Sequence, residues 1–284
     1  MRLIVDSGST KTDWICLNDE GKLVFETQTL GLNPQVLDEH IIEERIINNY
    51  DLYQNRENIS HLFFYGAGCG TEPPKKLIKK VFESIFVKAS IDVKEDTLAA
   101  VYSAATRGEK SIVSIIGTGS NCTYFDGENI HQKITSLGYI LMDDSSGNYF
   151  GRQLIRDYFF NKMPSDILKK FSDSFDLDPN LVKDKLYKKP NPNTYLATFA
   201  KFVVENKNNV YCSELIKKGF NLFITNQIEQ FPDCKEIPLH FIGSISFYLK
   251  DELDECLKNR GMILGNVLKK PIEGLVNYHL KYSN

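Results

Sequence analysis

The chain has 284 residues, which is enough for one large domain or two small ones. Lys and Arg number 34 and Asp and Glu number 37, so the formal net charge is −3, and this balance argues against binding to nucleic acid or to an anionic membrane surface. Hydrophobic residues make up 42% and charged residues 25%, which excludes an intrinsically disordered chain.

The first residues and the cysteines predict a cytoplasmic protein. The apolar run Leu3–Val5 ends at Asp6, so it is too short for a secretory signal. No stretch reaches the roughly 20 apolar residues of a membrane-spanning helix. The six cysteines are scattered and contain no C-x-x-C pair, which argues against a zinc ribbon or a redox motif. We therefore expect buried, reduced thiols and no membrane partner.

The opening of the chain predicts three short strands. Residues 3–5 form an apolar run, 6–12 a small polar loop and 13–17 a second extended segment. Residues 18–21 have the composition of a turn, and 22–26 alternate polar and apolar side chains as a half-buried strand does.

The same order of elements recurs further along the chain. A β-branched run at 111–116 is followed by a Gly/Ser/Thr loop at 117–120 and a second predicted strand at 121–125. Asp126-Gly127 is a strong hairpin turn, and 130–134 is a plausible third strand. The recurrence indicates two units of similar architecture, each opening with a glycine-bearing hairpin.

Helices and strands alternate over the rest of the chain, which predicts an α/β fold. We place the domain boundary between 108 and 109, giving a first domain of 1–108 and a second of 109–270. Strands are expected at 61–65, 91–93, 237–242 and 262–264, and a surface loop with a short helix at 176–193. Helices are expected at 37–50, from Pro73 or Pro74 to 86, from Asp96, at 146–159, 194–205, 211–228 and 244–258, and from Pro271 to 279.

The glycine loops are candidate phosphate sites. The chain has no Walker A sequence and no G-x-G-x-x-G before a helix. Small residues in a hairpin loop let backbone N–H groups approach an anion closely, although one such loop is most often only a turn. Two loops at equivalent positions could hold a polyphosphate from both sides of a cleft. A third element, Gly243-Ser244, either approaches a nucleotide base or ribose or is a plain strand-to-helix turn.

Several polar residues stand where strands end or helices begin. Asp6 could hold a magnesium ion through water, or cap a turn. Asp96 could accept the proton of a substrate hydroxyl as a general base, or cap its helix. Asp143 and Asp144 could cap a helix, bind sugar hydroxyls or assist the metal. Asn33 precedes a proline and suits either polyol recognition or a turn.

These motifs resemble those of one superfamily. The loop Asp6–Asp13 resembles the first phosphate motif of the actin, sugar kinase and heat-shock 70 ATPase superfamily, and Gly117–Cys122 resembles the second. Gly243-Ser244 before a helix resembles its adenosine motif. Within the superfamily the chain is most similar to the N-acetylglucosamine kinase and BadF/BadG/BcrA/BcrD ATPase family, for which the string G-T-G-S-N-C is fairly specific.

The resemblance implies two ribonuclease-H-like domains around a hinged cleft that holds ATP and Mg²⁺, with the C-terminal helix 271–284 packed on the first domain. It implies phosphoryl transfer to the 6-hydroxyl of an N-acetylated amino sugar, with N-acetylglucosamine as the first expectation, and a homodimer is possible because dimers are common in the family. Asp96 matches the catalytic base and Asp6 the metal site. The implied nucleotide-binding residues are Gly8, Ser9, Thr10, Lys11, Gly117, Thr118, Gly119, Ser120, Gly243 and Ser244. The implied sugar-binding residues are Asn33, Gly68, Asp96, Gly138 and Asp143.

The sequence departs from the family pattern near the expected sugar site. Animal relatives have Gly-Asp-Glu-Gly-Ser where this chain has Met142–Ser146, and a tryptophan where it has Leu137. N-acetylmuramate or another amino sugar therefore stays open as the acceptor. Two other functions also stay open: an activator ATPase of an acyl-CoA dehydratase, although its Asp-Ile-Gly-Gly-Gln-Asp string is missing, and a non-catalytic regulator that binds sugar or nucleotide.

Overall fold

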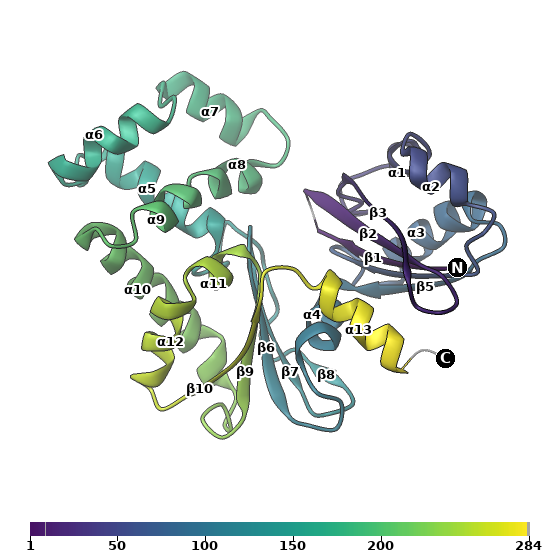
Figure 1. The fold of residues 1–284 in the computed structure, drawn as a ribbon. Helices are drawn as coiled ribbons and strands as arrows, with labels where there is room; N and C mark the ends of the chain where they lie inside the picture. The colour runs from purple at the N-terminus through teal and green to yellow at the C-terminus, as the bar shows by residue number, and fades with distance from the viewer. Residues whose placement is uncertain (9, 283–284) are drawn as a thin grey trace. The chain divides into compact units, whose positions relative to one another are not determined.

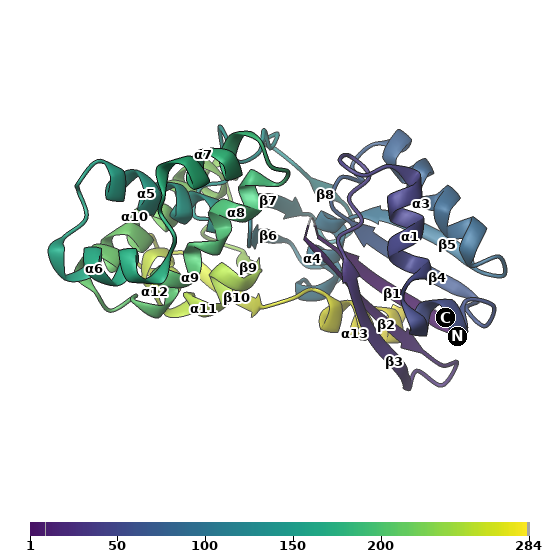
Figure 2. The ribbon, with the colours of Figure 1, turned by 90° about the horizontal axis from the view of Figure 1, so that it is seen from above.

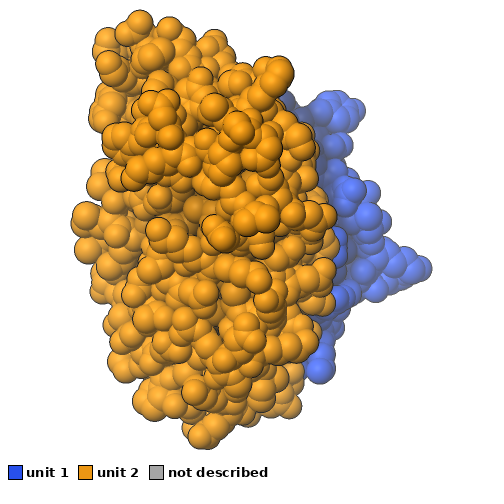
Figure 3. Space-filling view, turned by 90° about the vertical axis from the view of Figure 1, so that its left-hand side faces the viewer, with its two compact units in different colours: residues 1–103, 271–284 blue, residues 104–270 orange. Residues whose placement is uncertain are grey.

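The computed structural model describes residues 1–8 and 10–282. The chain divides into two compact units, one made of Met1–Ser103 with Pro271–Asn284 and the other of Ala104–Lys270 (Figure 3). Each unit contains one five-stranded mixed sheet with helices packed against it (Figure 1). In the part of the chain that the structure describes, none of the helices is both long and apolar enough to cross a membrane.

The sheet of the first unit has the strand order β3-β2-β1-β4-β5. The strands β1 (Arg2–Ser7), β2 (Lys11–Leu17) and β3 (Leu23–Leu30) form an antiparallel meander, which confirms the three predicted opening strands. The strands β4 (His61–Gly66) and β5 (Ser90–Glu95) are parallel to β1. Ser7 of β1 is in register with Gly66 of β4, and Gly66 with Glu95 of β5, so these three strand ends lie side by side.

Alternate residues of β1 enter two different cores, as the pleat of a strand requires. Leu3 and Val5 pack with Trp14 against the helices α1 (Glu39–Ile47), α2 (Tyr50–Asn55) and α3 (Glu72–Ile85). Ile4 faces the other side, where α4 (Asp96–Ala104) and α13 (Ile272–Tyr282) pack (Figures 1 and 2). The apolar residues of this second core, besides Ile4, are Leu17, Tyr65, Ala99, Ile272 and Leu275.

The helix predicted at 37–50 is confirmed as the shorter α1, which ends at Ile47, whereas α2 was not predicted. Asn49 has extended backbone angles and its side chain accepts a hydrogen bond from Leu52 N. This is the geometry of a helix N-cap, so Asn49 ends the helical run and starts α2.

The sheet of the second unit repeats the topology of the first, with the order β10-β9-β6-β7-β8. The strands β6 (Ser111–Ile116), β7 (Ser120–Phe125) and β8 (Ile130–His131) are antiparallel, and the last is shorter than predicted. The strands β9 (Pro238–Ile242) and β10 (Ile263–Leu268) are parallel to β6 and to each other.

The second unit is richer in helices than the sequence predicted. No helix was predicted at Ser165–Ser174, whereas the short helix predicted within the surface loop 176–193 is confirmed as Pro179–Tyr187, with a proline in its first turn. The predicted helix 244–258 is interrupted at Leu249, whose φ is −110° and ψ 31°. The helices are α5 (Gly147–Phe159), α6 (Ser165–Ser174), α7 (Pro179–Tyr187), α8 (Pro192–Thr198), α9 (Ala200–Glu205), α10 (Val210–Asn226), η1 (Ile228–Gln230), α11 (Ser244–Tyr248) and α12 (Lys250–Lys258).

Candidate functional site

The first hairpin carries two acidic residues, one on each of its strands. Asp6 at the end of β1 is the Cα partner of Asp13 on β2, so both side chains leave the same face of the sheet. The Asp13 carboxylate lies 3.4 Å from Lys11 Nζ. Gly8 N donates to Lys11 O at 3.0 Å and closes the turn, while the predicted Ser9 lies outside the described residues. Among the residues predicted here, the structure therefore brings Asp6, Gly8 and Lys11 together.

The hydroxyl groups of this hairpin have a role that the sequence analysis missed. Ser7 Oγ and Thr12 Oγ1 are buried and share a hydrogen bond of 2.8 Å. Leu32 N donates to Ser7 Oγ at 3.0 Å, and Thr12 Oγ1 donates to Leu30 O at 3.2 Å. The hydroxyl pair thus fixes the segment that leads to Asn33.

Asn33 and Gly68, both predicted to bind the sugar, lie against each other. Gly68 has a φ of +82°, and a Cβ atom built on it would be 2.2 Å from Asn33 Oδ1. Gln35 N donates to the same Oδ1 at 2.9 Å, and Gln35 Nε2 donates to Gly68 O at 3.3 Å. Only glycine fits here, because both the backbone angle and the close approach exclude a side chain.

Asp96 begins α4 directly after β5, next to these loops. Burial, and then the charge of Glu95, raises the pKa of Asp96 to about 6. A Cβ on Gly70 would lie 3.2 Å from Glu95 Oε1, so the loop after β4 touches this acidic pair. Burial raises the pKa of Cys69 in the same loop to about 12, with the charge of Asp96 as the next contribution, so this thiol is protonated and unreactive.

The first unit therefore gathers its candidate residues at the carboxyl ends of β1, β4 and β5. Open α/β sheets bind ligands at this edge. A carboxyl group with a pKa near 6 matches the requirement for a general base at neutral pH. The arrangement places the polar groups of the Asn33 and Gly68 loops next to a carboxyl group of raised pKa.

The loop between β6 and β7 in the second unit rests on the first turn of α5. Gly147 N donates to Gly117 O at 2.7 Å, and Asn148 N donates to Thr118 O at 3.0 Å. In a trans peptide the N–H points opposite to the preceding C=O. The N–H groups of Thr118 and Gly119 therefore both point away from α5. Successive N–H groups aimed to one side form a concave site for an anion.

The predicted adenosine motif adjoins this loop. Gly243 follows β9 and has a φ of +125°. A Cβ on it would lie 2.3 Å from Ile116 O and 3.0 Å from Gly117 N. Ser244, the first residue of α11, is exposed. The structure thus brings together Gly243 and Gly117, which are far apart in the sequence.

Asp143 lies against the same loop. Its Oδ2 would be 2.7 Å from a Cβ on Gly119, and it accepts hydrogen bonds from Asn148 Nδ2 at 2.9 Å and from the Ser120 backbone N–H. Burial raises the pKa of Asp143, and the bond from Asn148 opposes this rise. Gly138, also predicted to bind the sugar, has a φ of +78° and accepts a hydrogen bond from the backbone N–H of Met142 in the turn before Asp143. Asn148 was not named from the sequence, where an Asn near the start of a helix signals only capping.

The acidic residues of the first hairpin suit a magnesium ion better than a metal held only by protein side chains. Across residues 1–8 and 10–282, no group of three or more His, Cys, Asp and Glu side chains is placed to hold an ion. Magnesium is usually held by one or two carboxylates together with water and substrate phosphates. The pair of Asp6 and Asp13 fits that requirement.

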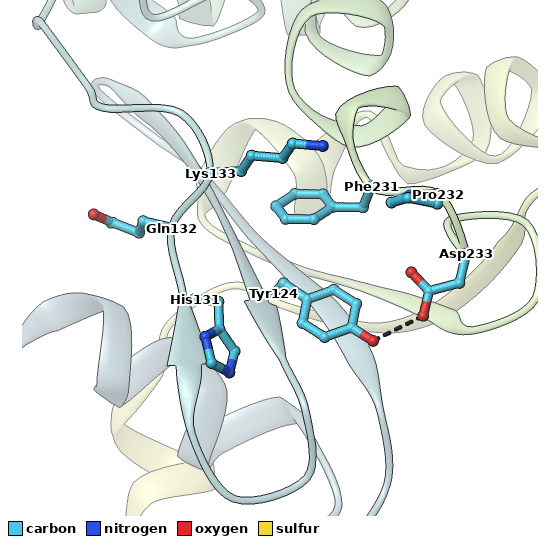
Figure 4. Close-up of a pocket in the computed structure, with 7 residues that line it drawn as sticks. All are labelled: Tyr124, His131, Gln132, Lys133, Phe231, Pro232 and Asp233. Carbon is cyan, nitrogen blue, oxygen red and sulfur yellow. Dashed lines mark hydrogen bonds between the residues drawn. The ribbon is translucent and has the colours of Figure 1, made fainter.

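An open pocket of about 600 Å³ lies elsewhere in the second unit (Figure 4). Tyr124 and Phe231 stack there with ring centroids 5.4 Å apart, and Tyr124 OH donates to Asp233 at 2.7 Å. Tyr124 lies toward the end of β7 opposite to the one that adjoins the Gly119 loop. The pocket is lined by Tyr124, His131, Gln132, Lys133, Phe231, Pro232 and Asp233. None of these residues was predicted as a site residue.

Both units have the ribonuclease-H-like arrangement of three antiparallel and two parallel strands with flanking helices. Two such units in one chain, with a glycine loop in the first hairpin of each, define the fold of the actin-like ATPases and sugar kinases. Residues 5–259 match the model of the BadF/BadG/BcrA/BcrD ATPase family, and the chain belongs to this family.

Solved structures agree with this assignment. A protein of Porphyromonas gingivalis, described as a putative N-acetylglucosamine kinase, is 34% identical with a TM-score of 0.93 over 100% of both chains. A second protein so described, from Chromobacterium violaceum, is 14% identical with a TM-score of 0.74 over 98% of each chain. A ROK family glucokinase from Streptomyces griseus, in complex with glucose and AMPPNP, is 13% identical with a TM-score of 0.58 over 97% of each chain. The last two show the fold alone. No curated protein matches the chain.

Proposed function

We propose that the protein is an ATP-dependent kinase that phosphorylates the 6-hydroxyl of an N-acetylated amino sugar, with N-acetylglucosamine as the first candidate. The observation that carries the proposal is the cluster at the carboxyl ends of β1, β4 and β5. There the Asp96 carboxyl, with a pKa of about 6, adjoins the loops of Asn33 and Gly68. The description of the 34% identical Porphyromonas gingivalis protein supports the same class of acceptor.

The proposed reaction uses few protein groups. The sugar hydroxyl oxygen attacks the γ-phosphorus, the bond from that phosphorus to the leaving oxygen of ADP breaks, and Asp96 takes the hydroxyl proton. The N–H groups of Thr118 and Gly119 would bind phosphate oxygens, as would the hairpin loop that contains Gly8. Magnesium, when bound, neutralises charge on the phosphates, and Asp6 with Asp13 would hold it.

Phosphoryl transfer from ATP to a panel of sugars tests the proposal. The panel contains N-acetylglucosamine, N-acetylmannosamine, N-acetylmuramate and glucose. We expect transfer to at least one N-acetylated sugar, and we expect Asp96→Asn to lower kcat by about a hundredfold or more while ATP still binds. Asp92→Asn is the matched control, since Asp92 is an exposed carboxylate on the same strand β5. Transfer by Asp96→Asn within tenfold of the wild type would remove Asp96 from the proposed role.

The same assay separates the alternatives. A non-catalytic regulator binds sugar or nucleotide but produces no sugar phosphate. An activator of an acyl-CoA dehydratase needs thiols that can reach a shared iron–sulfur cluster, whereas the six cysteines of this chain are all buried. Nothing in the structure favours either alternative over the kinase.

A further inference from the structure

The Asn148 side chain joins two parts of the second unit. Asn148 is the second residue of α5 and is 99% buried, with 1% of its surface exposed. Its Nδ2 donates to Thr118 O at 2.7 Å and to Asp143 Oδ2 at 2.9 Å. The Thr118 carbonyl can only accept hydrogen bonds, so it fixes which atom of the amide is the nitrogen.

Helix capping does not account for this amide. Ser146 is the N-cap of α5, and its Oγ accepts the hydrogen bond from Tyr149 N at 3.2 Å. The Oδ1 of Asn148 is buried and has no hydrogen-bond partner among the residues that the structure describes. An unsatisfied buried oxygen destabilises the folded protein. We therefore infer that the two hydrogen bonds donated by Nδ2 offset the destabilisation from Oδ1.

The two hydrogen bonds set the geometry of the loop. Thr118 O accepts both Asn148 N and Asn148 Nδ2, so its carbonyl cannot turn without breaking two bonds. The Thr118 carbonyl and the Gly119 N–H belong to the same peptide plane and point in opposite directions. The Gly119 N–H is therefore held pointing away from α5. The other bond holds the Asp143 carboxylate beside Gly119.

We propose that Asn148 is a positioning residue of the loop Gly117–Ser120: its amide clamps Thr118 to Asp143 and so holds the loop N–H groups in the direction that binds the phosphates of a nucleotide. The inference rests on the proposed use of ATP. Asn148 itself is buried, so we expect its removal to weaken binding only through the loop.

Asn148→Ala tests this inference, and Asn226→Ala is its matched control. Asn226 Nδ2 donates at 2.8 Å to Oδ2 of Asp144, the residue next to Asp143, but Asn226 is exposed. The dissociation constants of ATP and of adenosine are measured for each protein, because adenosine has no phosphates for the loop to bind.

We expect Asn148→Ala to raise the Kd of ATP by about tenfold, as for the loss of one to two hydrogen bonds, and to leave the Kd of adenosine within about twofold. Asn226→Ala should change neither constant. If Asn148→Ala does not fold, Asn148→Ser replaces it, and its Kd for ATP should lie between those of the wild type and the expected alanine value.

Two results would overturn the inference: an equal loss of affinity for ATP and adenosine, which indicates general damage to the unit, or an unchanged affinity for ATP. A wild-type protein that binds ATP but phosphorylates no sugar would refute the proposed function and leave the inference standing. A wild-type protein that binds no ATP would refute both.

Discussion

Replacing Ser145 with glycine should stabilise the protein. Ser145 is fully buried and has a φ of +64°, in the left-handed region that only glycine enters without cost. Its Oγ has no hydrogen-bond partner within residues 1–8 and 10–282. A serine here therefore bears both a strained backbone and an unsatisfied hydroxyl.

The expected gain follows from opposing contributions. Left-handed backbone in a non-glycine residue costs about 1–2 kcal/mol, and Ser145→Gly removes this cost. Glycine also makes the unfolded chain more flexible, which lowers the free energy of unfolding by about 0.4–1 kcal/mol. Removing an unsatisfied buried hydroxyl gains about 1 kcal/mol or more, whereas the lost packing of one small group costs about 0.8 kcal/mol. We expect Ser145→Gly to raise the free energy of unfolding by about 1 kcal/mol.

The neighbouring Ser146 provides a control, because its replacement by glycine should lower the free energy of unfolding instead of raising it. Ser146 has a φ of −78°, and its Oγ donates to Asp143 O at 2.7 Å and accepts from Tyr149 N at 3.2 Å. Ser146→Gly loses both bonds and should lower the free energy of unfolding by about 1 kcal/mol. Urea unfolding of the two variants measures this through their midpoints at constant m-value. If Ser145→Gly lowers the midpoint as Ser146→Gly does, the reasoning from strain is refuted.

Three further predictions concern the site and the response to pH. Gly119→Ala forces the Asp143 carboxylate to move, since Oδ2 lies 2.7 Å from the new Cβ, and should lower kcat/KM for ATP by about tenfold. Because Asp96 must be unprotonated to accept a proton and its pKa is about 6, kcat/KM should fall as pH drops through 6. Glu95→Gln removes a like charge beside Asp96 and should move this fall to lower pH. An unchanged pH profile in Glu95→Gln would contradict the assignment of Asp96 as the general base. Burial lowers the pKa of His279 from 6.5 to about 4. Between these pH values His279 is protonated in the unfolded chain but neutral in the folded protein, so the free energy of unfolding should decrease as pH falls from 6.5 to 4. Urea unfolding at pH 7 and pH 5 should show a smaller decrease in His279→Gln.

The opening hairpins were the most predictable parts of the fold. The apolar runs at 3–5 and 111–116 and their polar loops carry a local signal of period and turn chemistry, and the structure confirms both strands. Helix ends were less predictable. The helix predicted at 37–50 ends at Ile47, and the capping residue Asn49 starts a second helix that was not predicted.

Residues of the candidate site were predictable only where a motif carried them. Gly117 and Gly243 were named from separate motifs, and the register of β6 with β9 explains why they adjoin. Asn148 and Ser145 could not be named, because the importance of an amide or of a positive φ depends on which atoms the folded chain places around it. No local pattern encodes those distances.

The first unit is built from two distant stretches of the chain, and this affects the order in which it can form during synthesis. Ile4 and Tyr65 share a core with Ile272 and Leu275, which leave the ribosome only after the whole second unit has been made. The second unit is continuous and can complete its core earlier. Until α13 arrives, α4 alone covers this face of the first sheet, so the newly made chain presents an apolar surface that a chaperone could shield.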